Sequence, residues 1–240
     1  MSLLKTGVLK TPFCQTKKLA RNLLETFPQG EMLVEAYRRD QRVRQLRCYL
    51  EVGDIYPAER EAILRDFGAV CMNTQLHGAG IFNLEFVARE IIARGVEGVF
   101  VECGTWRGGS LGLWARTVMR NGGDVARCPI FGFPRERVTI TKGWFQDTLP
   151  LKTEAIGKIA VLRLDGDFSE STKFCLEKLY DQVVSGDTVI IDDYGVFPGC
   201  QRAVDEFIAA RSCRCGSSTS MSPCTFSSSP EGPRINSKLN

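Results

Sequence analysis

Apolar residues recur with two different periods along this chain, and these periods separate helical segments from extended ones. Between residues 84 and 92 they follow the spacing of one helical face, at Leu84, Val87, Ala88, Ile91 and Ile92. Short, mostly apolar runs at 99–101, 159–164 and 188–191 are instead typical of strands that are buried on both faces. Helical and extended segments alternate up to residue 211, which predicts an α/β fold with a doubly wound, mainly parallel sheet.

Apolar faces, glycines and prolines predict the remaining elements. Further helices are expected over residues 17–27 and 31–50, from Pro57 to Phe67, from Leu111 to Val118, from Ser169 as N-cap to Leu179, and from Cys200 to Ile208. Residues 138–141 are expected to form another strand, and Ser185-Gly186 to turn the chain before the strand at 188–191. This order predicts an N-terminal helical cap at 1–83 and a core at 84–211.

The last part of the chain differs from the core in composition. Residues 212–240 hold nine serines, three cysteines and three prolines, and their apolar residues show no usable period. Such a segment cannot bury enough apolar surface to offset the entropy of ordering it, so we expect a disordered tail.

Composition favours a soluble globular protein and excludes some classes of partner. Of the 240 residues, 43% are hydrophobic and 25% are charged, and the net charge of +3 is too small to indicate nucleic acid or an anionic membrane as a partner. No run of about 18 apolar residues and no secretory signal are visible. Ten cysteines without a C-x-x-C pair, beside a single histidine, argue against a common zinc site and for a reducing, cytoplasmic compartment.

A glycine-bearing turn follows the first predicted core strand. Val99–Val101 is followed by Glu102, Gly104, Gly108 and Ser110, and then by a helical pattern. In an open α/β sheet, this strand–turn–helix unit receives a nucleotide-like ligand, because glycines let the backbone approach it closely. The spacing is neither G-x-G-x-x-G nor a P-loop. The alternative is an ordinary strand-to-helix turn whose glycines serve packing.

Two pairs of aspartates follow two predicted parallel strands. Asp165 and Asp167 come after the strand at 159–164, and Asp192 and Asp193 come directly after residue 191. Because these strand ends share one edge of the sheet, the carboxylates are expected to converge, and they repel one another unless a cation lies among them. Oxygen ligands favour a hard divalent ion, Mg²⁺ by default. Alternatively, some of these aspartates only cap helices or form turns.

Six segments together resemble the macrocin O-methyltransferase (TylF) family. They are ECGTWRGGS (102–110), KGWFQDTLP (142–150), RLDGD (163–167), EST (170–172), VIIDDYG (189–195) and PGCQRAVD (198–205). The resemblance covers about residues 75–211. It implies a Rossmann-like class I methyltransferase that uses S-adenosylmethionine and Mg²⁺ to methylate a hydroxyl, typically on a sugar of a natural product.

The resemblance also implies roles for individual residues. As metal ligands it implies Asp165, Asp192 and Asp193, with Asp167 as the general base. Around the methionine end of the cofactor it implies Glu102, Gly104, Gly108 and Ser110, and near the adenine Phe145, Gln146 and Asp147.

The chain departs from the family pattern in two places. Residues 126–134 stand where the family has a strand that ends in a ribose-binding acid, and they contain no acid. The family's two closing strands also have no counterpart before the tail. We therefore expect an incomplete core.

These departures leave other functions open. One alternative is a non-catalytic, methyltransferase-like binding or scaffold protein. Another is a nicotinamide-using Rossmann enzyme, against which the aspartate pairs speak. The expected partner is a small hydroxylated substrate, with no nucleic acid and no membrane, and a homo-oligomer is left open.

Overall fold

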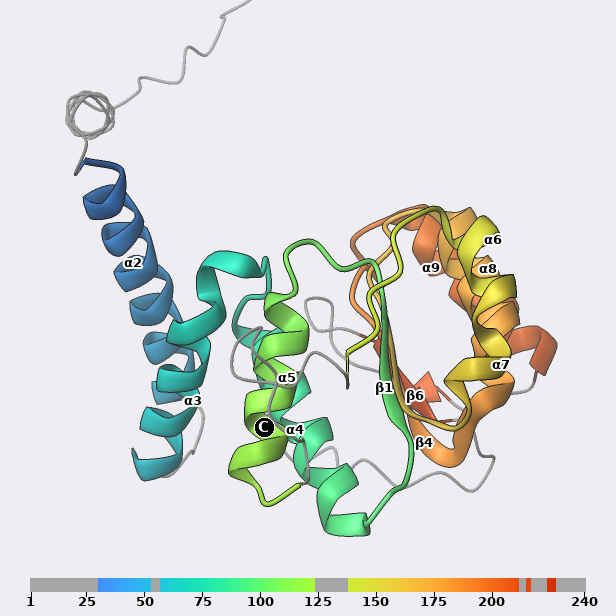
Figure 1. Cartoon of the computed structure of the whole chain (residues 1–240), viewed down its shortest axis with the longest axis horizontal. Helices are drawn as coiled ribbons and strands as arrows, with labels where there is room; N and C mark the ends of the chain where they lie inside the picture. Colours follow the sequence, from blue (N-terminus) through green and yellow to red (C-terminus); the bar gives the residue numbers. More distant parts are fainter. Residues whose placement is uncertain (1–29, 53–56, 124–137, 212–214, 217–223, 228–240) are drawn as a thin grey trace, which may run out of the picture.

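A five-stranded sheet forms the centre of the computed structural model, which describes residues 30–52, 57–123, 138–211, 215–216 and 224–227 (Figure 1). The strand order is β1-β3-β4-β6-β5. The strands are β1 (Val99–Cys103), β3 (Ile159–Leu164), β4 (Val183–Ile191), β5 (Cys215–Gly216) and β6 (Cys224–Ser227). The first three are parallel, and β6 pairs antiparallel with both β4 and β5.

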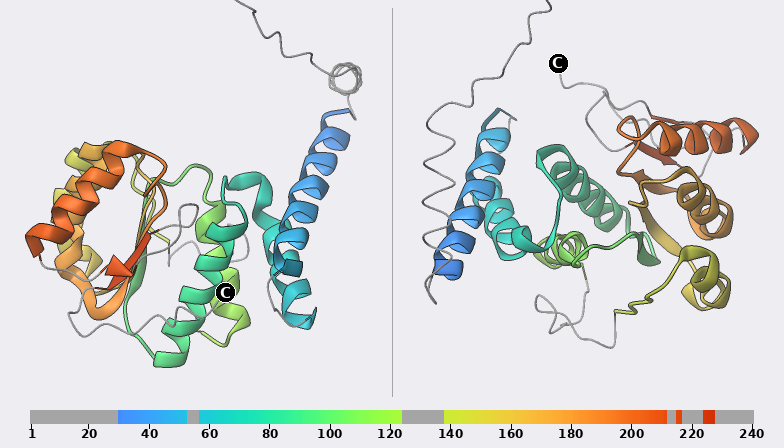
Figure 2. Two further views of the ribbon diagram at one scale, coloured as in Figure 1. Left: turned by 180° about the vertical axis from the view of Figure 1, so that it is seen from behind. Right: turned by 90° about the horizontal axis from the view of Figure 1, so that it is seen from above.

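Helices cover both faces of this sheet, as Figures 1 and 2 show. On one face lie α4 (Gly78–Arg94) and α5 (Gly109–Arg120), and on the other α8 (Ser169–Leu179) and α9 (Pro198–Arg211), accompanied by the short α6 (Phe145–Thr148) and α7 (Thr153–Ile156). A separate apolar cluster fills each interface between helices and sheet. This arrangement confirms the predicted doubly wound, mainly parallel α/β fold.

The N-terminal helices pack on the outside of α4 and α5 (Figure 1). They are α2 (Gly30–Val52) and α3 (Pro57–Val70), followed by the 3₁₀ turn η1 (Cys71–Asn73). Leu46 and Leu50 of α2 join the apolar cluster of α4 and α5. The Arg42 guanidinium of α2 donates hydrogen bonds to three carbonyls that follow α3, those of Cys71, Thr74 and Leu76. None of the helices in the described residues is long and apolar enough to cross a membrane.

A buried ionic cluster joins α3, α4 and α5. The Arg120 guanidinium contacts both Asp66 and Glu85, whose side chains are 7% and 4% exposed. Arg116 Nε donates to Asp66 Oδ1 at 3.1 Å, and Thr117 Oγ1 donates to Glu85 Oε1 at 2.7 Å. Because removing one member would leave a buried charge unpaired, the cluster fixes the relative positions of these three helices.

The predicted helices between residues 31 and 211 are present, and the strand at 159–164 has the expected bounds. Two local predictions are wrong. Residues 138–141 form no strand. Ser185-Gly186 lies inside β4, at an irregularity where the register passes from the pair Ile159–Val183 to the pair Val161–Thr188. Phe168 takes the N-cap position of α8, and Ser169 is its first residue.

The C-terminal segment also differs from its prediction. Six residues of the expected tail form β5 and β6, and β6 pairs with the edge of β4 over residues 188–191. A neighbouring strand satisfies backbone groups that β4 would otherwise leave unpaired, whatever the side-chain period. The other tail residues, the helix predicted at 17–27 and the segment 126–134 lie outside the described residues.

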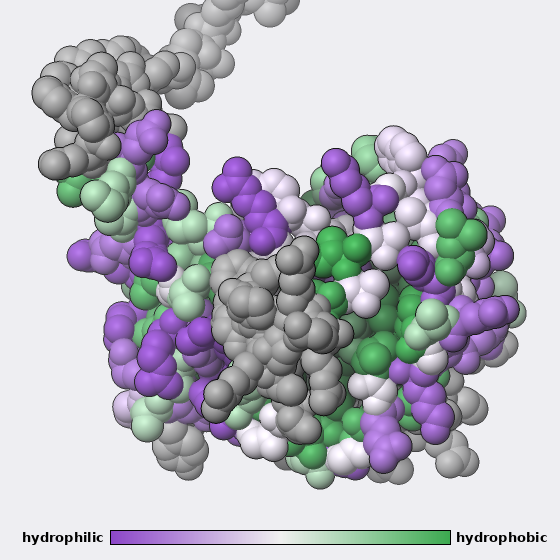
Figure 3. All heavy atoms as spheres, viewed as in Figure 1, coloured by the Kyte–Doolittle hydropathy of each residue, from purple (hydrophilic) through white to green (hydrophobic). Residues whose placement is uncertain are grey.

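The strand β1 is less buried than its apolar run predicts. Val99 is 44% exposed, and Phe100 and Val101 are half-buried. In the described sheet β1 is an edge strand, with only β3 beside it. Figure 3, in the same view as Figure 1, shows apolar side chains at the surface near the centre of the molecule.

Candidate active site

Acidic residues gather at the carboxyl ends of β1, β3 and β4. Glu102 of β1 lies in register with Arg163 of β3. The ladder continues one residue past each strand, since Asp165 N donates to Cys103 O at 2.8 Å and Asp192 N to Leu164 O at 2.9 Å. The sheet itself therefore brings these side chains to one edge, as the sequence predicts.

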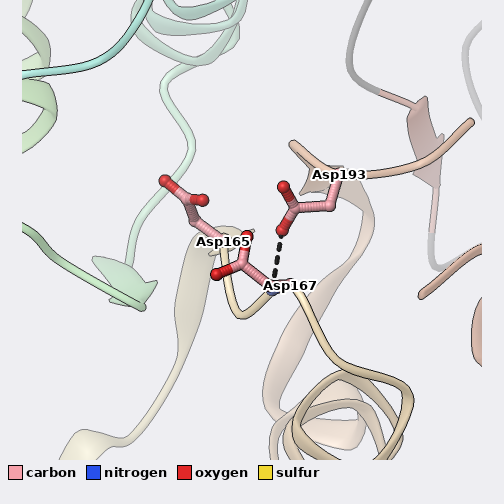
Figure 4. A group of neighbouring side chains, drawn as sticks. All are labelled: Asp165, Asp167 and Asp193. Atoms are coloured by element: carbon pink, nitrogen blue, oxygen red, sulfur yellow. Dashed lines mark hydrogen bonds between the residues drawn. The ribbon is translucent and has the colours of Figure 1, made fainter. Parts of the chain in front are cut away.

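Three carboxylates form the group most suited to a cation. Asp165, Asp167 and Asp193 each offer an oxygen, and these oxygens lie within 4.8 Å of one another (Figure 4). Asp167 has a left-handed backbone (φ 57°), and its N–H donates to Asp193 Oδ2 at 2.9 Å. Aspartate tolerates this conformation better than most residues do, so the bend brings a third carboxylate beside the other two.

The donor set and its electrostatics fit a divalent ion. Three oxygens around one octahedral Mg²⁺ ion lie about 3 Å apart at adjacent positions and about 4.2 Å apart at opposite ones, so separations of up to 4.8 Å would have to shorten on binding. Burial raises the pKa of Asp165 to about 6; Asp192 adds to this rise and Arg163 opposes it. Burial also raises the pKa of Asp193. A cation among these oxygens would favour their charged forms.

A buried arginine stands between this group and the turn after β1. Arg163 is 1% exposed. Its Nη1 lies 2.5 Å from Glu102 Oε1 and 2.9 Å from Asp165 Oδ2, and its Nη2 lies 3.0 Å from Asp192 Oδ2. Although burial disfavours its charge, Asp192, Glu102 and Asp165 raise the pKa of Arg163 above its ordinary value.

The sequence reasoning missed this role of Arg163. The sequence prediction places a metal ion among the converging acids, although an arginine side chain can supply positive charge there as well. The signal was a charged residue inside an otherwise apolar strand, two positions before Asp165 and therefore on the same face of the sheet.

The structure groups the aspartates differently from the expectation. Asp165 and Asp193 lie together, and Asp167 joins them. Asp192 instead contacts Arg163 and lies near the start of α4, where a Cβ on Gly80 would be 3.8 Å from its Oδ1. The N-terminal end of a helix favours a carboxylate, so Asp192 has two favourable neighbours without a metal ion.

The glycine-bearing turn packs directly against the end of β3. Gly104 has φ +98°, and a Cβ there would lie 1.7 Å from Asp165 O. Gly108 is the left-handed N-cap of α5 (φ 75°), and Ser110 is buried in the first turn of that helix. Thr105 Oγ1 donates to Glu102 Oε2 at 2.8 Å. Both Glu102 oxygens therefore have partners inside the protein.

The predicted adenine-side residues lie on α6. A Cβ on Gly166, between Asp165 and Asp167, would be 3.6 Å from a ring carbon of Phe145, so this helix borders the acidic loop. Gln146 and Asp147 are exposed on α6.

The chain is similar to known O-methyltransferases. A sequence model of the family described as Macrocin-O-methyltransferase (TylF) matches residues 126–216. The 8-demethyl-8-(2,3-dimethoxy-alpha-L-rhamnosyl)-tetracenomycin-C 4'-O-methyltransferase of Streptomyces olivaceus is 31% identical over 201 residues, which cover 64% of this chain and 75% of that protein. The demethyldecarbamoylnovobiocin O-methyltransferase of Streptomyces niveus is 51% identical over 74 residues, 31% of this chain and 28% of that protein.

A solved structure supports the same fold. The O-methyltransferase NovP superposes with a TM-score of 0.53 at 22% identity, over 80% of this chain and 98% of that one. At this identity the likeness concerns the fold rather than the reaction.

Proposed function

The chain belongs to the macrocin-O-methyltransferase (TylF) family of enzymes, and on this premise we propose that it methylates a sugar hydroxyl of a natural product, using S-adenosylmethionine and Mg²⁺. The observation that carries the proposal is the group of Asp165, Asp167 and Asp193 at the sheet edge beside the turn of Gly104. The rhamnosyl group in the name of the Streptomyces olivaceus relative supports a sugar as the methylated part.

In this proposal, Asp165 and Asp193 hold the metal ion. Bound there, Mg²⁺ would act as a Lewis acid that lowers the pKa of a substrate hydroxyl. Asp192, also expected as a ligand, is assigned instead to holding Arg163, which its Oδ2 already contacts.

Asp167 is the proposed general base. It is exposed, unlike Asp193, so a substrate hydroxyl can approach it from solvent. It takes the hydroxyl proton while the oxygen bonds to the methyl carbon and the carbon–sulfur bond of the sulfonium breaks. A positioned base contributes about 10² to 10⁴ in rate.

The turn after β1 and the start of α5 are proposed to hold the methionine end of the cofactor. The first N–H groups of a helix have no acceptor within the helix, so those of α5 would attract its carboxylate, and Gly104 and Gly108 would allow the backbone to approach it. Phe145, Gln146 and Asp147 are proposed to lie near the adenine. The main task of these residues is to align oxygen, carbon and sulfur.

Calorimetry of cofactor binding and a methyl-transfer assay, both with the purified chain, test the proposal. We expect S-adenosylmethionine to bind, and methyl transfer to glycosylated acceptors to stop in excess chelator and to return with Mg²⁺. Full transfer in chelator would refute the metal assignment. Absence of heat and of a thermal shift at millimolar cofactor would favour the non-catalytic scaffold.

A further inference from the structure

Arg163 contacts both proposed ligand subsites with the same nitrogen. Its Nη1 donates to Glu102 Oε1 in the cofactor turn and to Asp165 Oδ2 in the acidic group. Its Nη2 contacts Asp192 Oδ2 after the third parallel strand. One planar guanidinium therefore links the ends of β1, β3 and β4.

Three acidic side chains surround the one guanidinium of Arg163, so its three contacts depend on one another. Three carboxylates share a single buried cation, so none of them is fully neutralised by a partner of its own. A change in the charge of one carboxylate alters how strongly Nη1 holds the others, because charges interact strongly away from water. Nη1 carries two hydrogens and donates to Glu102 and Asp165 at the same time, so a change at one contact shifts the geometry of the other.

The third nitrogen of the Arg163 guanidinium, Nε, is not placed as a purely stabilising role would require. Arg163 Nε is buried and has no hydrogen-bond partner among the described residues. An arginine placed only for stability would be expected to satisfy its buried donors, since unpaired ones are costly. The guanidinium is instead oriented so that both terminal nitrogens face the acids.

We propose that Arg163 is a positioning residue that couples the cofactor turn to the acidic group, because its guanidinium holds Glu102 Oε1 and Asp165 Oδ2 in fixed positions relative to each other. This inference rests on the proposed function. It assigns Arg163 no contact with substrate or cofactor, and its effect passes through Glu102 and Asp165.

The test is a double-mutant cycle on cofactor affinity, measured by calorimetry with S-adenosylmethionine and no metal. Asp165→Asn removes a charge from the acidic group, and in the native background it is expected to change the cofactor Kd by about threefold or more. In an Arg163→Lys background the same change is expected to have less than about a twofold effect, because an ammonium lacks the fork that bridges two carboxylates.

A matched control separates positioning from loss of stability. Arg120→Lys alters a half-buried arginine that likewise bridges two acids, Asp66 and Glu85, on α3 and α4. We expect this variant to lose stability yet to keep the full response of cofactor affinity to Asp165→Asn.

Two results for cofactor affinity would overturn the proposed coupling through Arg163. An equal response of the cofactor Kd to Asp165→Asn in the native and the Arg163→Lys backgrounds overturns the proposal. If Arg163→Lys does not fold, an Asp165→Asn variant whose cofactor Kd stays within about twofold of the native value overturns it alone. A native chain that binds neither S-adenosylmethionine nor Mg²⁺ would instead reject the proposed function.

Discussion

Gly104 occupies the point where the ends of β1 and β3 come closest. Its φ is +98°, and a Cβ on this residue would lie 1.7 Å from Asp165 O, so only hydrogen fits there. The glycine that was expected to let the cofactor approach therefore has a packing role as well. The packing alternative therefore holds for Gly104, and its contact with a cofactor stays a prediction.

Gly104→Ala is expected to destabilise the fold by about 2 kcal/mol or more, because backbone atoms must move apart and the residue must keep a strained φ. The matched control is Gly95→Ala, where the backbone is left-handed (φ +62°) and nothing lies within 4 Å of a Cβ. That variant meets only the conformational cost, about 1–2 kcal/mol. Urea unfolding measures both, and equal losses would contradict the packing role of Gly104.

Asp167→Asn is expected to lower turnover by about 10²- to 10⁴-fold, because an amide cannot take the hydroxyl proton. Asparagine tolerates the left-handed backbone of this residue, so stability should change little. Cofactor affinity, measured by calorimetry, should stay within about twofold of the native value. A parallel loss of affinity and turnover would indicate a structural role for Asp167.

At the scale of elements, the ionic cluster of α3, α4 and α5 holds the cap to the core. Asp66 comes from α3, Glu85 from α4 and Arg120 from α5. Arg120→Met is expected to cost about 3–5 kcal/mol in unfolding free energy, because it leaves the buried Glu85 without its cation and Asp66 with Arg116 alone. Arg211→Met, which removes an exposed pair with Asp181, is expected to cost under about 1 kcal/mol. Urea unfolding of the two variants measures the difference, and similar losses would contradict the role given to the cluster.

The same cluster predicts a pH dependence of stability. Burial raises the pKa of Glu85 above its ordinary 4.5, while Arg120 and Thr117 oppose the rise. Between 4.5 and the raised value, the unfolded chain has lost this proton and the folded chain retains it. This group therefore makes stability fall as pH rises through that window. Glu85→Gln should remove this part of the pH profile in urea unfolding, and an unchanged profile would contradict the assignment.

At the scale of the whole molecule, the two proposed ligands should stabilise the fold, because both subsites join segments that are far apart in the sequence. Each ligand at about 100 times its Kd should add about 2.7 kcal/mol to the unfolding free energy. Asp193→Asn should abolish the stabilisation by Mg²⁺ and keep most of that by S-adenosylmethionine. Thermal unfolding with each ligand alone measures this, and loss of both effects would point to a damaged fold.

Local patterns predicted most helices and the buried strand at 159–164, because apolar periodicity reports directly which face of an element is covered. They failed at Ser185-Gly186, which lies at an irregularity inside β4 instead of in a turn before it, and in the tail, where β6 pairs with β4. A short paired strand needs no apolar period of its own.

The sequence by itself determined the order of the helices and of the three parallel strands between residues 31 and 211, the doubly wound topology, the family and the edge of the sheet where the acids meet. Only the tertiary structure decided which acids form the group: Asp167 joins Asp165 and Asp193, whereas Asp192 contacts Arg163. The physical reason is distance. Strand order follows from patterns along the chain, but charges pair according to separations of a few ångströms across strands, and these depend on register and side-chain direction.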